Sequence, residues 1–235
     1  MKTLIHRSAD RGHNNFGWLD SFHSFSFGRY YDPEKMGFGM LRVLNDDIVE
    51  GAAGFGTHPH DNMEIISIPL QGAIEHKDST GTIGVIHTGD VQIMSAGTGI
   101  THSEYNHSKS DKLNFLQLWV IPKEKNIKPR YAQKSYRISD KPDQWHTVVA
   151  PDREEALWIN QDAYFSLLKT TKDAEVNYQL RNPQNGVYIF TIEGNFSLDG
   201  NQMNRRDAIG ISGTAEFKLK AASESYLLAV EVPLS

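Results

Sequence analysis

The sequence has 235 residues and no cysteine. This absence excludes disulfide bonds, iron–sulfur clusters held by thiolates and a cysteine nucleophile. Nowhere do about 18 apolar residues follow one another, as a membrane-spanning helix requires, and the first residues lack the apolar segment of a signal peptide. We therefore predict a cytoplasmic protein that makes no membrane contact.

Long runs of one charge sign are also missing. The chain carries 24 Lys and Arg against 29 Asp and Glu, which gives a formal net charge of -5 at pH 7. This balance gives no general reason to expect direct nucleic-acid binding. The basic segment 128–137, which contains two tyrosines, is interpreted as a solvated linker. The Gly-x-Ser-x-Gly motif of serine hydrolases is absent as well.

Long helical patterns are absent, and short apolar segments separated by Gly and Asp follow one another closely. This spacing predicts an all-β sandwich or barrel. A short helix is predicted around 151–155, where acidic residues follow Pro151. The expected strands include 40–44, which is predicted to end at Asn45-Asp46-Asp47, and the segments 65–72, 73–77, 91–94 and 113–121.

The second half of the chain repeats segments of the first half in the same order. This order indicates the internal duplication of one β domain. We predict an N-terminal metal-binding domain, a connector rich in Lys, Glu, Pro and Asp, and a C-terminal domain without metal ligands. The boundaries are 1–122, 123–145 and 146–235, and the matched segments are 64–72 with 187–194, 90–95 with 207–212, and 114–122 with 225–233.

The repeat does not extend to histidine, because all ten histidines lie at or before His146. Counting from the matched segments places Leu180 at the position of His58 and a position near Leu219 at that of His102. The C-terminal domain therefore cannot contain a second imidazole site.

Two pairs of side chains have the spacing of metal ligands. His58 and His60 lie two residues apart, as do His102 and Glu104. In an extended segment, residues at this spacing point to one face. Imidazole and carboxylate groups together suit divalent transition metals. We predict one metal held by His58, His60, His102 and Glu104, with iron(II) as the first candidate and copper, manganese, cobalt, nickel or zinc as alternatives.

Glu64 is the competing carboxylate, because it also lies an even number of residues from His60. A second carboxylate ligand would remove a coordination position that dioxygen or substrate needs. We therefore assign Glu104 as the ligand and Glu64 to a supporting or structural role.

The remaining histidines are interpreted as structural or solvated, as lone histidines usually are. His23 is expected to be a hydrogen-bonded core residue, with a role in a pocket as the alternative. The others are His76, expected at the surface or in a structural role at a hairpin, the solvated His87 and His107, and His6, His13 and His146, which lack a partner in the sequence.

Three long segments resemble the pirin family, and most closely its bacterial quercetinase-like members. They are Gly-Trp-Leu-Asp-Ser-Phe-His-Ser-Phe-Ser-Phe-Gly at 17–28, Thr-His-Pro-His-Asp-Asn-Met-Glu at 57–64, and Ser-Ala-Gly-Thr-Gly-Ile-Thr-His-Ser-Glu at 95–104. The resemblance implies a bicupin, with two jelly-roll-like cupin barrels face to face and few short helices. It implies the same four ligands, in the N-terminal barrel only, and a monomeric chain.

The resemblance also implies quercetin 2,3-dioxygenase activity, in which O2 opens the central ring of a flavonol with loss of carbon monoxide. Glu104 would then be the catalytic base for the flavonol hydroxyl. Phe25, Phe27 and Met94 could form apolar walls or belong to the core. The alternative function is a non-enzymatic regulator that binds a transcription factor or a metabolic enzyme.

Overall fold

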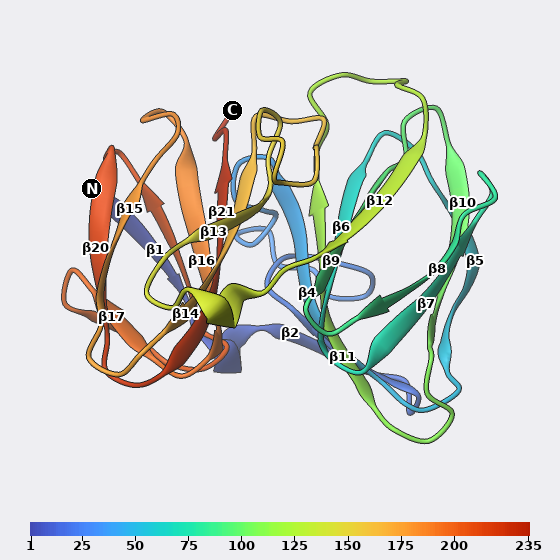
Figure 1. Cartoon of the computed structure of the whole chain (residues 1–235), viewed down its shortest axis with the longest axis horizontal. Helices are drawn as coiled ribbons and strands as arrows, with labels where there is room; N and C mark the ends of the chain where they lie inside the picture. The colour runs from blue at the N-terminus through green and yellow to red at the C-terminus, as the bar shows by residue number, and fades with distance from the viewer.

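The computed structural model describes residues 1–235 and consists almost entirely of β-strands, as predicted. Two barrels lie side by side, and each has a large and a small sheet (Figure 1). The large sheet of the N-terminal barrel has the order β12-β9-β6-β11-β4-β3-β2 and its small sheet the order β5-β10-β7-β8. The strands are β2 (Gly12–Asn15), β3 (Leu19–His23), β4 (Leu41–Val49), β5 (Gly54–His60), β6 (Glu64–Gln71), β7 (Ala73–Asp78), β8 (Ile83–His87), β9 (Asp90–Ser95), β10 (Ile100–Asn106), β11 (Leu113–Val120) and β12 (Arg130–Ser135).

The C-terminal barrel has a large sheet of order β1-β19-β16-β21-β14-β13 and a small sheet of order β15-β20-β17-β18. Its strands are β1 (Lys2–His6), β13 (His146–Val149), β14 (Tyr164–Thr170), β15 (Glu175–Gln179), β16 (Gly186–Glu193), β17 (Phe196–Leu198), β18 (Asn201–Met203), β19 (Ala208–Ser212), β20 (Glu216–Ala221) and β21 (Ser225–Val232).

Helical structure is limited to two short 3-10 turns, η1 (Ser8–Asp10) and η2 (Ile138–Asp140). The helix predicted around 151–155 was wrong, because this segment forms turns. Its acidic residues suit a helix start, but no apolar periodicity follows them to bury a helical face. No helix in the chain has the length and apolar character needed to cross a bilayer.

The internal duplication is confirmed by the sheet order. The central strands of the two large sheets run β9-β6-β11-β4 and β19-β16-β21-β14, so the matched sequence segments occupy matching places. The small sheets correspond in the same way, with β5-β10-β7-β8 matching β15-β20-β17-β18. Each half of the chain therefore builds the same two-sheet unit.

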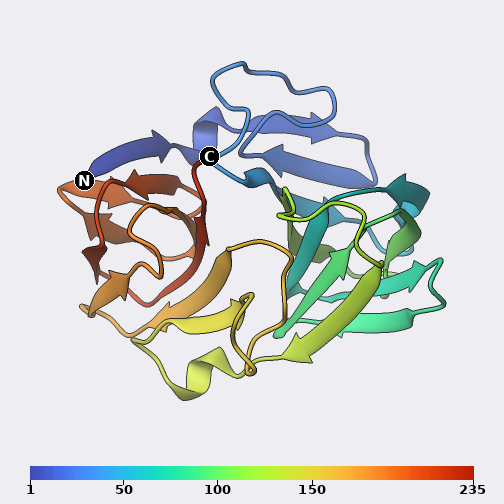
Figure 2. The same ribbon diagram turned by 90° about the horizontal axis from the view of Figure 1, so that it is seen from above.

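The two barrels exchange an edge strand. The N-terminal strand β1 pairs with β19 of the C-terminal barrel, from Lys2 opposite Ser212 to His6 opposite Ala208. In the other direction β12, which lies in the predicted connector, pairs with β9 of the N-terminal barrel. Figure 2 shows the blue first strand beside the red C-terminal segments. The predicted domain boundaries at 122 and 146 therefore stay a proposal. Strands β1 and β12 each join the sheet of a barrel that lies outside their own predicted segment.

The main core lies between the two large sheets, which face each other. It contains 26 buried apolar residues drawn from both barrels, among them Ile66 and Leu118 on one side and Phe165 and Tyr188 on the other. Strands such as β6 are buried on both faces, which is why their sequences are almost continuously apolar. Each such side chain contributes about 1.5–3 kcal/mol, so this layer holds the barrels in one arrangement.

The interiors of the two barrels differ. A cluster of 15 buried apolar residues fills the C-terminal barrel, and it includes Leu180 and Leu219. The N-terminal barrel contains only two small apolar clusters, of 6 and 4 buried residues. Leucine thus fills the space in one barrel that imidazole lines in the other, and only the N-terminal barrel keeps room for a site.

Candidate metal centre

Three histidines meet on the small sheet of the N-terminal barrel. Strand β5 pairs with β10, and this register sets His58 opposite His102. The ring centroids of His58 and His102 lie 4.4 Å apart, and His60 lies 4.9 Å from His58 and 5.0 Å from His102. One ring nitrogen from each of the three lies within 4.8 Å of the others. The predicted spacing therefore brings the three imidazoles together.

An irregularity in this strand pair shapes the site. The register between β5 and β10 shifts between His102 and Glu104, so that Glu104 pairs with Phe55. Such bulges redirect side chains and are frequent beside functional sites. Here the bulge brings Phe55 into the same cavity as His58. Gly54 allows the close strand approach, because a Cβ atom there would clash with the Glu104 carbonyl oxygen.

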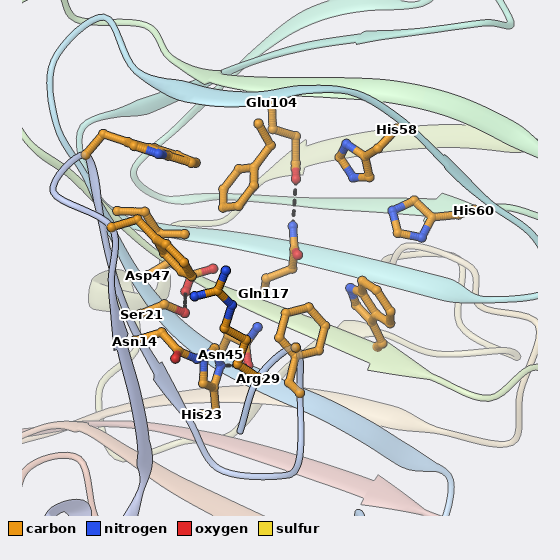
Figure 3. A pocket seen from close by; sticks show the side chains of 17 residues that line it. Asn14, Ser21, His23, Arg29, Asn45, Asp47, His58, His60, Glu104 and Gln117 are labelled. Atoms are coloured by element: carbon orange, nitrogen blue, oxygen red, sulfur yellow. Dashed lines mark hydrogen bonds between the residues drawn. The ribbon is translucent and has the colours of Figure 1, made fainter. Parts of the chain in front are cut away.

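Glu104 is buried and held by two neutral donors. Ser67 Oγ donates to its Oε1 at 3.0 Å, and Gln117 Nε2 donates to its Oε2 at 2.6 Å. Glu104 forms a second group of candidate donors with His76 and His102, also within 4.8 Å. The four predicted residues are thus divided between two groups that share His102. Figure 3 shows Glu104, His58 and His60 at the same end of one cavity.

His60 and His102 are in the neutral form that binds metals. Burial and the neighbouring His58 and His76 lower the pKa of His102 to about 3, and burial and His102 lower the pKa of His60 to about 4. His58 Nδ1 lies 2.7 Å from the Gly56 carbonyl oxygen, to which it donates, so its Nε2 lone pair is free.

His102 provides the test of fit for a metal. Both of its ring nitrogens are buried, and neither has a hydrogen-bond partner. Leaving a buried polar group unsatisfied costs about 1–3 kcal/mol. A metal–nitrogen bond would give one of these nitrogens a partner. Together with the carboxylate of Glu104, the cluster fits a divalent metal ion.

Glu64 points away from this cluster. It accepts hydrogen bonds from Ser95 Oγ at 2.8 Å and from the Asn160 backbone at 3.2 Å, on the side of the C-terminal barrel. The expected even spacing from His60 fails because the chain turns at 61–63, where Asn62 has a φ of 44°. Of its predicted roles, the structure supports the structural one. Burial raises the pKa of Glu64 to about 7.

His76 was predicted to lie at the surface or to have a structural role. The surface position was wrong, because its side chain is fully buried. Its Nε2 lies 3.0 Å from Asp78 Oδ2, and its ring centroid lies 5.4 Å from that of His102. Its Nδ1 has no partner. The signal was present in the sequence, since His76 and Asp78 alternate with exposed Glu75 and Lys77 along β7.

The other histidines lie away from the imidazole cluster. His87 and His107 are exposed, as predicted. His23 is buried and lies within 2.9 Å of both Asn14 and Asn45, and it lines the cavity, so both of its expected roles apply.

The cavity has a volume of about 410 Å³ and lies inside the N-terminal barrel. Two aromatic pairs form much of its wall. The rings of Trp18 and Phe55 meet edge to face at 5.3 Å, and so do those of Phe27 and Trp119. Of the three predicted wall residues only Phe27 lines the cavity, because Phe25 and Met94 lie in apolar cores.

Sequence reasoning missed three polar side chains of the large sheet. Gln117 and Asp47 line the cavity, and Ser67 donates a hydrogen bond to Glu104. A usable signal was a polar residue flanked by apolar residues within a strand, as Gln117 is in Leu113–Val120. The predicted strand end at Asn45-Asp46-Asp47 was also wrong, since β4 continues to Val49. Its polar residues face the cavity or a buried arginine, Arg11, instead of forming a turn.

Comparison with known proteins agrees with this architecture. Residues 5–120 match the pirin family, and residues 147–232 match the quercetinase C-terminal cupin domain. The chain is 40% identical to the quercetin 2,3-dioxygenase of Escherichia coli over 97% of this chain and 98% of that protein. It is 38% identical to a putative quercetin 2,3-dioxygenase of Pseudomonas aeruginosa, over 96% and 98% of the two chains.

Among solved structures, a bacterial pirin from Escherichia coli in complex with nickel(II) superposes with a TM-score of 0.94. It is 39% identical, and the match covers 100% of both chains. The predicted bicupin fold is thereby confirmed, and the chain belongs to the pirin family.

Proposed function

We propose that this protein is a metal-dependent dioxygenase that opens the central ring of a flavonol such as quercetin with O2 and releases carbon monoxide. The observation that carries the proposal is a hydrogen-bonded carboxylate beside three clustered imidazoles at one end of an aromatic cavity. The relatives that bear this name support it.

The ligands in this proposal are His58, His60, His102 and Glu104. We propose iron(II) as the first metal to test, because imidazole and carboxylate donors suit it, and copper, manganese, cobalt, nickel and zinc as the alternatives. When bound, the metal supplies Lewis acidity that lowers the pKa of the flavonol hydroxyl and promotes its ionisation.

Glu104 is the proton acceptor for the hydroxyl of the flavonol central ring. Each carboxylate oxygen accepts one protein hydrogen bond, from Ser67 and from Gln117, and retains a second lone-pair direction. The two donors fix the orientation of the carboxylate, so a substrate hydroxyl at this end of the cavity meets an acceptor already in place. The proton leaves the hydroxyl and is held on a carboxylate oxygen of Glu104.

The aromatic walls orient a flat substrate and limit access by water. The volume of about 410 Å³ falls in the range of pockets that enclose small organic ligands. The pairs Trp18–Phe55 and Phe27–Trp119 present ring faces and edges to a planar ligand. The reaction balances, because one flavonol and one O2 give one ring-opened ester and one carbon monoxide. Both atoms of O2 enter the ester, and the released gas is the hydroxyl-bearing carbon of the central ring with its own oxygen.

The test is an aerobic assay of the purified chain loaded separately with each metal. With quercetin present, O2 consumption and carbon monoxide release are expected in equal amounts. His58→Ala serves as the inactive variant, and His107→Ala, which changes an exposed histidine, as the matched control. A protein that binds one equivalent of metal yet consumes no O2 with quercetin under any of them contradicts the proposal.

A further inference from the structure

A second polar end of the cavity lies opposite the imidazoles, and the proposed chemistry does not use it. Figure 3 shows its side chains gathered away from His58 and His60. We call it the distal pole. It consists of Asn14, Ser21, His23, Asn45 and Asp47, all of which line the cavity.

The strand register assembles the distal pole on one face of the large sheet. Asn14 on β2 pairs with Ser21 on β3, which pairs with Asp47 on β4. One step along the strands, His23 pairs with Asn45. Directly opposed residues in antiparallel strands share a face, so these side chains form two adjacent polar rows.

The row of Asn45 reaches the metal end of the cavity. Asn45 pairs with Gln117 on β11, and Gln117 pairs with Ser67 on β6. Gln117 and Ser67 are the residues that hold Glu104. One polar row of the sheet therefore connects both ends, and a single elongated ligand can contact both.

Hydrogen bonds already fix part of the distal pole. His23 Nδ1 donates to Asn45 Oδ1 at 2.9 Å, and Asn14 Nδ2 donates to His23 Nε2 at 2.9 Å. These two bonds use one end of each amide. Asn45 Nδ2 stays an unused donor and Asn14 Oδ1 an unused acceptor, and both residues line the cavity.

Asp47 is the least satisfied member of the distal pole. The residue is 2% exposed, and its side chain accepts one hydrogen bond, from Ser21 Oγ to Oδ1. Oδ2 has no protein partner. The nearby buried cation, Arg11, pairs with Asp46 instead, and Arg29 lies over the Phe16 ring at 5.6 Å. Asp47 lines the cavity, so this oxygen can accept a hydrogen bond from a ligand there.

We infer that the distal pole binds ring hydroxyl groups of the flavonol that are remote from the metal end. Such a hydroxyl donates to Asp47 Oδ2 and accepts from Asn45 Nδ2. A phenolic hydroxyl suits both demands, because it is a donor and an acceptor on a planar ring that the aromatic walls can hold. The inference rests on the proposed function and adds a substrate class, namely flavonols hydroxylated on an outer ring.

The test compares quercetin with 3-hydroxyflavone, which has the central hydroxyl and keto groups but no hydroxyl on its outer rings. Binding to metal-free protein is measured by calorimetry, and kcat/KM is measured with metal-loaded protein. At pH 8, above the pKa of Asp47, which burial raises to about 7, wild type is expected to bind quercetin about ten-fold or more tightly than 3-hydroxyflavone, the value of one charge-assisted hydrogen bond.

Variants of Asp47 measure what its carboxyl group contributes to the preference for quercetin. Asp47→Ala is expected to remove this preference, and Asp47→Asn to retain part of it, with 3-hydroxyflavone affinity unchanged in both. Ser21→Ala, which frees Asp47 from its partner, should weaken quercetin binding in the same direction and covers the case in which the Asp47 variants do not fold. Asp20→Asn is the matched control, because this carboxyl lies on the outer face of β3 and contacts His13.

The two proposals fail in different ways. If metal-loaded wild type turns over neither flavonol, the proposed function is wrong, and the binding measurement still decides the role of the distal pole. Equal affinities for the two flavonols, or Asp47→Ala weakening both to the same extent, overturns the inference and leaves the proposed function standing.

Discussion

Gln117 Nε2 lies 2.6 Å from Glu104 Oε2, and this hydrogen bond joins the large sheet of the N-terminal barrel to its small sheet across the cavity. Gln117 and Ser67 together are the only side chains that hold the Glu104 carboxylate. The position of the proposed base therefore depends on two strands of the opposite sheet, β6 and β11.

Gln117→Ala should lower kcat because Glu104 loses one of its two donors. Loss of a supporting partner of a ligand typically costs about 10–100-fold in metal affinity or activity. The measurements are metal content and steady-state kinetics, with Gln179→Ala, an exposed strand glutamine, as control. Unchanged kcat and unchanged metal affinity would show that Ser67 alone is sufficient.

His58→Ala should eliminate bound metal and, with it, turnover. This side chain contributes one of three clustered ring nitrogens, and its other nitrogen is already committed to Gly56. Metal analysis after dialysis gives the answer directly. The exposed His107→Ala variant should retain metal, and a fully loaded His58→Ala protein would refute the proposed ligand set.

Glu64 should make stability depend on pH. Its pKa is raised to about 7 in the folded protein by burial, so the folded state holds a proton that the unfolded chain releases. Stability from this residue is therefore present at low pH and is lost as pH rises through about 4.5 to 7. The free energy of unfolding of Glu64→Gln, taken relative to wild type, should therefore be on the order of 2 kcal/mol higher at pH 8 than at pH 4.5.

Denaturant titrations at the two pH values measure this change. Asp47, whose pKa burial also raises to about 7, acts in the same direction but is common to both proteins and cancels. Glu216→Gln, at an exposed position of β20, is the control. A difference between Glu64→Gln and wild type that does not vary with pH would contradict this titration.

Leu219→Ala should destabilise the protein without affecting the metal centre. Leu219 is fully buried in the 15-residue cluster of the C-terminal barrel, and deletion of a buried leucine side chain costs about 2–5 kcal/mol. Thermal or denaturant unfolding and metal content are the two readouts, with the neighbouring exposed Lys218→Ala as control. If the variant lost metal while it stayed as folded as wild type, the C-terminal core and the metal centre would be coupled, which the structure gives no reason to expect.

Side chains alternate between the two faces of a strand. This period of two residues explains which parts of the site the sequence could predict. His58, His60, His102 and Glu104 were recognisable as two pairs because each pair lies within one extended segment. The same counting failed for Glu64, because the turn at 61–63 separates two strands and resets the direction of the side chains.

Other features depend on pairing between distant segments, which composition does not reveal. Strand β1 is mostly exposed and short, so nothing in its residues indicates that it joins β19. Asn45-Asp46-Asp47 has the composition of a turn, and it continues as a strand because the hollow barrel provides polar surroundings on one face and Arg11 on the other.

The exchanged edge strands have a consequence for synthesis. Strand β1 finds its partner β19 only after more than 200 further residues have been made. The N-terminal barrel, in contrast, has its last strand as soon as β12 emerges. The N-terminal barrel can thus finish folding while β1 is still unpaired, and a substitution in Lys2–His6 would act on the C-terminal barrel.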